Sequence, residues 1–467
     1  MTPFSTLQPP FISQFDPSEK GEVSADPLSL QRNYERLAER IYPHFTVRMR
    51  RARFLTAIAV GARVCQDIND NDEELVTPSW LGFEWYVMEA FGRQGYFDVQ
   101  RLASGFPGSL KVRMARKRQI PLSPGAYLKS PKVFGYTGVH KRLAIGLGIV
   151  NDRMELEPAG YRLLEAWELD QRLPDFQSGS RDGNVGAKML RTMESAVRRT
   201  LDLGYTQMNG SQSTWLAMCD HLDPDRIGKR ERDVLAELLL SPVAPKSRRD
   251  TGEPLDVESF RLRAQLLELL IAERGLNGHE CKFIRKAKLK VDPDLRERLA
   301  QIEAYEAVAF QLDTAFRCLL GLARRNANFA VTRSDFASAR EATKVATELP
   351  TLLSRLAESF VVVPHLWISG DNGSDVDSGI GFIHDSFAGV SSSAELFDAL
   401  TSYHEAVQRA KLPDGRRPWF DRIDEPEESV GLRPSLVENG DGTDRGDFIH
   451  DYRSRTAAQF LKDVRRF

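Results

Sequence analysis

The chain has 467 residues, a formal net charge of −2, 41% hydrophobic residues and 28% charged residues. This length predicts two to four domains, and the composition excludes a disordered chain. The longest apolar runs are far shorter than the roughly 20 residues of a membrane span, and the sequence does not open with a basic segment followed by an apolar block. We therefore expect a cytoplasmic protein without membrane contact or signal peptide.

The N-terminal part of the sequence predicts a flexible arm followed by helices. Residues 1–24 are rich in Pro, Ser and Gly, and Asp26 and Pro27 then form a typical helix start. Apolar residues spaced by three and four predict three helices within an N-terminal helical domain of residues 25–98. These helices are "LSLQRNYERLAERI", "VRMRRARFLTAIAVGARVC" and "SWLGFEWYVMEAFGRQG".

The next part of the chain carries charge of one sign only. From Val99 to Asn151 there is no Asp or Glu, although the segment contains ten cations. They are Arg101, Lys111, Arg113, Arg116, Lys117, Arg118, Lys129, Lys132, Lys141 and Arg142. Because like charges repel, such a block predicts a partner of opposite charge.

The end of this block, "GYTGVHKRLAIGLGIVNDRMELEPAGYRLLEAW", predicts a helix, a strand and a second helix. Thr137 can cap a helix that buries Val139, Leu143 and Leu147, with the cations on its other side. A turn at Gly148 and Asn151 leads into "RMELE", which alternates as a half-exposed strand does. A new helix begins at Pro158.

This order resembles the winged-helix family of bacterial DNA-binding domains. Leu156, Gly160 and Leu163 match the element that follows the wing in that family, and the resemblance covers residues 110–168. It implies an α+β DNA-binding module within residues 99–172. Two other interpretations stay open: a small α+β subdomain with a solvated basic face, and a protein-docking module.

The resemblance implies a role for each cation of the module. The "RMARKR" cluster and the lysines that follow would hold phosphates, His140, Lys141 and Arg142 would approach bases or backbone from the helix, and Arg153 would lie at the wing. The candidate nucleic-acid-binding residues are Lys111, Arg113, Arg116, Lys117, Arg118, Lys129, Lys132, His140, Lys141, Arg142 and Arg153.

Two further basic segments are open to either interpretation. Lys282, Arg285, Lys286, Lys288 and Lys290 form a set without an intervening acid, which is either a solvated helix face or an extension of the nucleic-acid path. "RMRRAR" alternates with apolar residues, which indicates that some of its arginines pair with carboxylates internally.

The remainder of the chain reads as mainly helical. We predict a linker at residues 173–187, a helical bundle at 188–360 and a helical, less regular C-terminal domain at 361–467. Asp292 and Pro293 cap a predicted long helix with a single apolar seam from Leu295 to Ala323. The predicted fold class is a mainly α, multi-domain protein with an embedded winged-helix-like module and a helical bundle in its C-terminal half.

The sequence contains few residues in patterns typical of catalysis or metal binding. Cys65, Cys219, Cys281 and Cys318 are scattered without CxxC spacing, which predicts reduced thiols and no cysteine-based metal site. No P-loop or HExxH motif is present. Three His–acid neighbours remain, since His and carboxylate together can hold a divalent metal.

These neighbours are His384–Asp385, His404–Glu405 and His450–Asp451. At least two of them would have to converge to form a site. We predict capping or exposed side chains instead. The sequence therefore favours a protein that is not an enzyme, with an enzyme left open, and we expect no metal and no cofactor.

The functional expectation is a subunit that binds nucleic acid, double-stranded rather than single-stranded DNA. The stretch from Phe106 to Val150 is also similar to bacterial proteins associated with restriction and phage-defence gene clusters. That similarity implies a DNA-sensing or accessory subunit whose partner is a separate helicase or nuclease, with a homo-oligomer left open. The alternatives are a winged-helix transcription regulator and a metal-dependent nuclease that uses His384, Asp385, His450 and Asp451.

Overall fold

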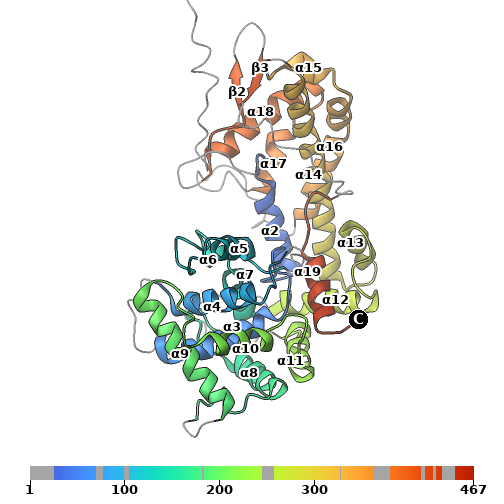
Figure 1. Cartoon of the computed structure of the whole chain (residues 1–467). Helices are drawn as coiled ribbons and strands as arrows, with labels where there is room; N and C mark the ends of the chain where they lie inside the picture. The colour runs from blue at the N-terminus through green and yellow to red at the C-terminus, as the bar shows by residue number, and fades with distance from the viewer. Residues whose placement is uncertain are drawn as a thin grey trace, which may run out of the picture. The chain divides into compact units, whose positions relative to one another are not determined.

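The structure is a computed structural model that describes most of the chain. The described residues are 26–69, 77–98, 105–180, 184–243, 257–326, 328–361, 379–411, 416–423, 428–433 and 448–467. They form helices α2 to α19 and a small antiparallel sheet, so the chain is mainly helical as predicted (Figure 1). No helix in these ranges is long and apolar enough to span a bilayer. The predicted arm at 1–24 and Arg101 lie outside them.

The chain divides into two compact units, each made of separate segments. Unit 1 contains residues 1–38 and 278–451, and unit 2 contains residues 39–277 and 452–467. These boundaries differ from the predicted ones, since they cut through the segments 25–98, 188–360 and 361–467. The predicted linker at 173–187 lies within unit 2, where Leu173 and Phe176 are buried. Residues 174–178 form turns inside this unit rather than a domain boundary.

In the described residues of unit 2 the regular secondary structure is helical, apart from one isolated β bridge. Its helices are α3 (Phe54–Asn69), α4 (Ser79–Arg93), α5 (Ser109–Lys117), α6 (Pro131–Phe134), α7 (Tyr136–Gly146), α8 (Pro158–Gln171), α9 (Val185–Leu203), α10 (Gln212–His221), α11 (Lys229–Leu240), α12 (Val257–Ala272) and α19 (Ser454–Asp463). The helix predicted at "VRMRRARFLTAIAVGARVC" is confirmed only from Phe54 onward as α3, since residues 47–53 are not helical. The helix predicted at "SWLGFEWYVMEAFGRQG" is confirmed as α4, which ends at Arg93, and both helices are almost entirely buried.

The helix α19 belongs to the core of unit 2 although it lies far along the sequence. It packs against α12, and Phe460 contacts Phe45 with a distance of 5.5 Å between ring centroids. The Asp463 carboxylate accepts a hydrogen bond from the Ala52 amide at 2.9 Å. Residues 452–467 therefore complete the core of the segment that precedes them by almost two hundred residues.

Unit 1 combines helices with a three-stranded sheet. Its helices are α13 (Glu280–Lys288), α14 (Pro293–Arg325), α15 (Arg333–Ala337), α16 (Arg340–Phe360), α17 (Ile380–Phe387) and α18 (Ser393–Arg409), together with most of α2 (Leu30–Ile41). The Asp292 carboxylate caps α14 by accepting a hydrogen bond from the Leu295 amide at 3.3 Å. The predicted seam from Leu295 to Ala323 is buried, and α16 packs along α14.

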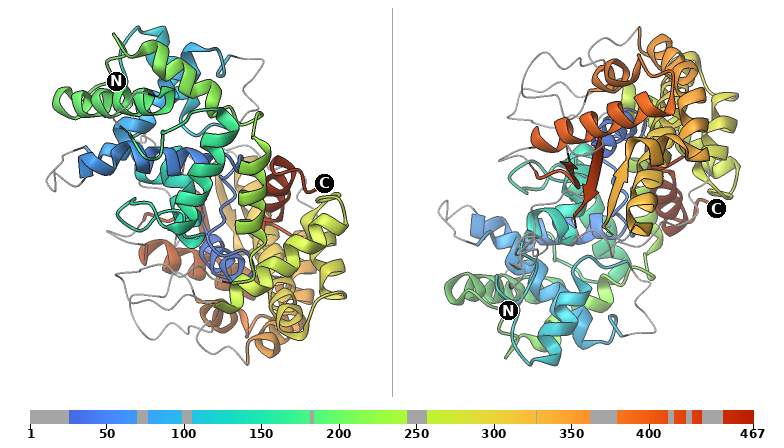
Figure 2. Two further views of the ribbon diagram at one scale, coloured as in Figure 1. Left: turned by 90° about the horizontal axis from the view of Figure 1, so that it is seen from below. Right: turned by 90° about the horizontal axis from the view of Figure 1, so that it is seen from above.

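The sheet of unit 1 has the order β1–β3–β2, and both pairings are antiparallel. Its strands are β1 (Ala330–Thr332), β2 (Phe420–Ile423) and β3 (Ser429–Leu432). Val430 of β3 pairs with Val331 on one side and with Arg422 on the other. Figure 2 (right) shows the gold arrow of β1 beside the red-orange arrows of the other two strands.

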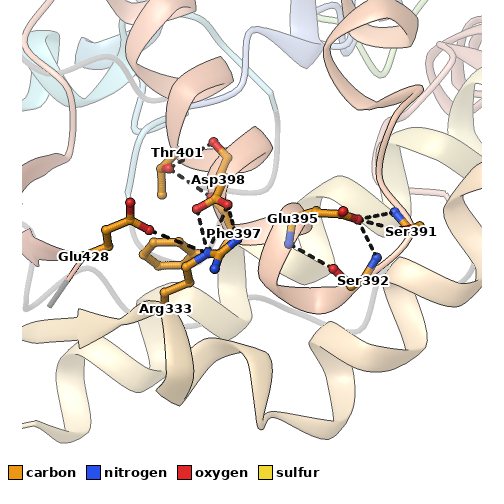
Figure 3. A network of polar contacts seen from close by, with 8 residues as sticks. All are labelled: Arg333, Ser391, Ser392, Glu395, Phe397, Asp398, Thr401 and Glu428. Carbon is orange, nitrogen blue, oxygen red and sulfur yellow. Dashed lines mark hydrogen bonds and ion pairs between the residues drawn. The ribbon is translucent and has the colours of Figure 1, made fainter.

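Arginine and carboxylate side chains join α15, α18 and the residue before β3 in unit 1 (Figure 3). Arg333 donates to both oxygens of Asp398 at distances of 2.6 to 3.0 Å, and Glu428 lies 3.7 Å from its Nε. The Asp398 carboxylate raises the pKa of the Arg333 guanidinium. Ser392 and Glu395 form the capping box of α18 close by.

Candidate nucleic-acid interface

A buried carboxylate holds the parts of the basic module together. Glu84 on α4 has 0% exposure and accepts hydrogen bonds from the Tyr127 hydroxyl at 2.8 Å and from the Thr137 amide at 2.9 Å. Tyr127 lies in the loop after α5, and Thr137 lies in the first turn of α7. Gly135 passes so close to Glu84 that a Cβ atom would clash with its carboxylate. The loop and α7 are therefore fixed on α4.

The short helix α5 turns its cations outward because it buries its apolar side. Val112 and Ala115 are buried, and α5 packs against α4. Arg116 donates to the Gly92 carbonyl, which ties the helix to the end of α4. Lys111, Lys117 and Arg118 are exposed.

Nine described cations of the acid-free segment form no ion pair with any carboxylate in the described part of the chain. They are Lys111, Arg113, Arg116, Lys117, Arg118, Lys129, Lys132, Lys141 and Arg142. Seven of them are exposed, while Arg113 and Lys141 are half-buried. The charge imbalance of the sequence therefore persists on the folded surface.

Helix α7 contributes fewer outward side chains than the sequence predicts. Lys141 is half-buried, and its Nζ donates to the Asp152 carbonyl at 2.8 Å. Burial lowers the pKa of the Lys141 amine; Asp152 opposes this shift, and the positive charge of Lys132 adds to it. Arg142 is exposed.

The prediction that His140 faces a partner is wrong. Its side chain has 0% exposure and lies between the rings of Phe54 and Phe460 at centroid distances of 5.2 and 6.2 Å. Burial lowers the pKa of His140 to about 4, and its Nδ1 is 2.8 Å from the Tyr136 carbonyl oxygen. Because α7 packs against α3, α4 and α6, its buried stripe is wider than one apolar seam.

The segment between α7 and α8 is tighter than a wing hairpin with a regular strand. Helix α7 ends at Gly146, and within residues 147–157, all of which the structure describes, β pairing is limited to one antiparallel bridge between Val150 and Leu156. The Asn151 side chain closes the turn by accepting from the Arg153 and Glu155 amides at 3.0 Å. The predicted strand at residues 153–157 is therefore reduced to a bridge, and the winged-helix resemblance stays a prediction. Arg153 is exposed in this turn.

The other basic segments are at least partly neutralised by carboxylates. Arg53 forms two hydrogen bonds with buried Glu231 at 2.9 and 3.0 Å, and Arg51 lies 3.0 Å from Asp225. This confirms that arginines of "RMRRAR" pair internally. In the basic segment of residues 282–290, which includes most of α13 in unit 1, Arg285 and Lys288 both pair with Glu303.

Two basic hollows of unit 2 were not predicted from the sequence. One, of about 630 Å³, has three cations and no carboxylate among the described residues that line it: Lys188, Arg191 and Arg199. These three cations lie on one face of α9. Their spacing of three and eight residues fits the helical period, so the sequence could have predicted that they cluster. Leu122, in the loop after α5, exchanges two hydrogen bonds with Thr206, which follows α9.

The second hollow, also of about 630 Å³, gathers cations from three distant segments. It is lined by six cations and by Asp225 and Asp463, and the sequence gives no sign of this convergence. The six cations are Arg50, Arg51, Arg232, Arg455, Lys462 and Arg465.

The His–acid neighbours do not form a metal site in the described residues. His384 contacts Asp385 at 3.0 Å, whereas His450 pairs with buried Glu306 at 2.6 Å instead of with Asp451. His404 is buried between the Pro27 carbonyl and the Trp419 amide, both at 2.8 Å from its ring nitrogens. The described residues contain no group of three or more metal-ligating side chains.

The four cysteines form no disulfide bond, and three of them are buried.

No protein-family model, curated protein or solved structure matches the chain.

Proposed function

We propose that unit 2 binds nucleic acid, and specifically double-stranded DNA, through the basic face of α5, α6, α7 and the loops between them. The observation that carries this proposal is the set of nine cations without a carboxylate partner in the described part of the chain. A protein surface normally mixes charges, and a one-signed face produces a potential that attracts a polyanion.

The physical basis of binding is the release of counterions from the phosphate backbone. The logarithm of the binding constant falls linearly with the logarithm of the salt concentration. Each lysine or arginine that neutralises a phosphate of B-DNA makes this slope steeper by about 0.9. Such contacts supply affinity without choosing a sequence. We therefore expect steep salt dependence and little sequence preference.

The test is a titration of a fluorescent 20-base-pair duplex at several salt concentrations. The double variant Arg118→Gln and Lys132→Gln removes two exposed cations of the basic face. We expect about tenfold weaker binding near 0.1 M salt and a salt slope that is shallower by about 2. The matched control is Arg226→Gln with Arg230→Gln, since these exposed arginines pair with Asp223 and Asp170.

Both variants lose the same net charge, so their comparison separates the basic face from the charge of the whole chain. Equal losses of affinity in the two variants, or no binding by the wild type at low salt, would refute the proposal. A single-stranded oligonucleotide that binds more tightly than the duplex would overturn the choice of duplex DNA.

The role within the cell is proposed on narrower grounds. The similarity of residues 106–150 to phage-defence-associated proteins supports an accessory or DNA-sensing subunit of a bacterial multi-protein system. A winged-helix transcription regulator would instead prefer one palindromic sequence. Competition between unrelated duplexes distinguishes them, since equal competition supports the accessory subunit and selection of one site supports the regulator.

A further inference from the structure

One arginine of unit 2 is buried without a counter-charge. Arg263 on α12 has 0% exposure, and its Nη2 donates to the Ser241 carbonyl at 3.2 Å. Its guanidinium carbon lies 4.6 Å from the centroid of the Phe260 ring. The Nε and Nη1 atoms are buried and have no hydrogen-bond partner. Burial lowers the pKa of Arg263 to about 10.

Burial of the Arg263 charge is energetically unfavourable unless another group accepts hydrogen bonds from Nε and Nη1. A buried ion is normally paired and fully hydrogen-bonded because desolvation of an isolated charge is costly. Arg53 in the same unit follows this rule, with Glu231 as its partner. No carboxylate in the described residues does the same for Arg263.

Arg263 lines a cavity of about 740 Å³. The cavity lies between the turn after α7, the start of α8, the end of α11 and α12, and all four belong to unit 2. Much of its wall is apolar and includes Leu147, Pro158, Leu238 and Phe260. Arg162 and Glu237 also line it, and these exposed side chains satisfy each other at 2.6 Å. A volume of this size is typical of small-molecule sites.

We propose that this cavity binds a small organic acid whose carboxylate accepts hydrogen bonds from Arg263 and whose apolar body contacts the aliphatic and aromatic wall. A carboxylate provides the acceptors that Nε and Nη1 of Arg263 lack. Glu157 also lines the cavity and forms no ion pair with Arg263, so we expect the acid to bind with its carboxylate at Arg263 and away from Glu157. A neutral apolar molecule would leave both donors unsatisfied. This inference goes beyond DNA binding and can be tested without DNA.

The experiment measures binding of octanoate and phenylacetate to the full chain by calorimetry, with 1-octanol as the uncharged probe. We expect the two acids to bind and the alcohol to bind at least tenfold more weakly. Arg263→Met should weaken binding of the acids at least 100-fold. The matched control is Arg261→Met on the same helix, because Arg261 pairs with Glu258, and its affinity should stay within about twofold of the wild type.

A second variant keeps Arg263 and removes the space. Ala159 lines the cavity, so Ala159→Phe places a ring inside it and should abolish binding of the acids. This variant tests the proposal independently of whether Arg263→Met folds. The proposal is overturned if neither acid binds, if 1-octanol binds as tightly as octanoate, or if Ala159→Phe leaves the affinity of the acids unchanged.

The acids of residues 244–256, which lie outside the described residues, are the competing source of a carboxylate. The triple variant Asp250→Asn, Glu253→Gln and Asp256→Asn should leave octanoate binding unchanged. If it instead creates or strengthens octanoate binding more than tenfold, the chain itself provides the acceptor in the wild type, and the proposal fails.

Discussion

The arginines of unit 1 near the sheet and the cations of the basic face in unit 2 have opposite surroundings. Arg333 is held by Asp398 and lies near Glu428, which come from two other segments of the chain (Figure 3). The nine cations around α5, α6 and α7 have no such partner among the described residues. At the sheet of unit 1 a carboxylate neutralises the arginine that joins two segments, whereas the cations of the basic face keep their charge available for the partner that we propose.

The largest effect should come from breaking the most buried of the internal pairs. In Glu231→Ala, the Arg53 guanidinium, with a side-chain exposure of 1%, would lose its carboxylate. We expect the free energy of unfolding to fall by about 3–5 kcal/mol, because an uncompensated charge remains buried. Urea denaturation followed by circular dichroism measures this loss. A loss below about 1 kcal/mol would contradict the assigned role of this pair.

A second prediction uses two buried histidines, one in each unit. Burial lowers the pKa of His140 in unit 2 and of His404 in unit 1 to about 4, against about 6.5 in the unfolded chain. Between pH 6.5 and pH 4 the unfolded state therefore binds more protons, and stability falls as the pH is lowered. The contribution lost by each histidine is about 3 kcal/mol at pH 4, and it is fully present above pH 6.5.

Hydrogen exchange at pH 7 and pH 5, analysed by peptides from each unit, tests this histidine effect. In His140→Phe the pH dependence of unit 2 should decrease while that of unit 1 stays unchanged. Retention of the whole pH dependence in unit 2 would show that His140 does not titrate as assigned.

A third change sharpens the extent of the basic face. Lys188→Gln with Arg199→Gln removes two cations of the hollow on α9, which the loop after α5 reaches through Leu122 and Thr206. If the DNA path continues onto α9, we expect about a tenfold loss of affinity without a change in urea stability. Unchanged DNA binding would confine the interface to α5, α6 and α7.

The smallest effect should come from the exposed pair of unit 1. Asp398→Asn removes the partner of Arg333, and the two side chains are 45% and 39% exposed. Surface ion pairs contribute little, so the melting temperature should change by no more than about 2 °C and the change should shrink at high salt. A shift above about 6 °C would show that this network stabilises the junction of α15 and α18.

Local patterns predict the helices of this chain well and its long-range arrangement poorly. The spacing of apolar residues and the Asp292 cap are sufficient to predict α14, because both signals lie within one helix. The sequence does not predict the strands β2 and β3, since each is four residues long and β3 pairs with β1 across almost one hundred residues. The boundaries of the two units were missed for the same reason.

The candidate site shows the same division between local and long-range signals. Charge sign along the sequence predicts the nine cations that remain without carboxylates. One helical stripe does not predict that Phe54 of α3 and Phe460 of α19 pack against a buried His140. The unsatisfied donors of Arg263 could not be predicted at all, because only the packed fold shows which partner an arginine lacks.

The late position of α19 has a consequence for biosynthesis. Residues 39–277 leave the ribosome well before Phe460 and Asp463, which contact Phe45 and the Ala52 amide. At about 5–20 residues per second, the emerging segment waits roughly 10–35 s for the helix that completes its core. During that interval the nascent chain exposes an apolar surface, so ribosome-associated chaperones should bind to ribosomes that translate the segment between residues 277 and 452.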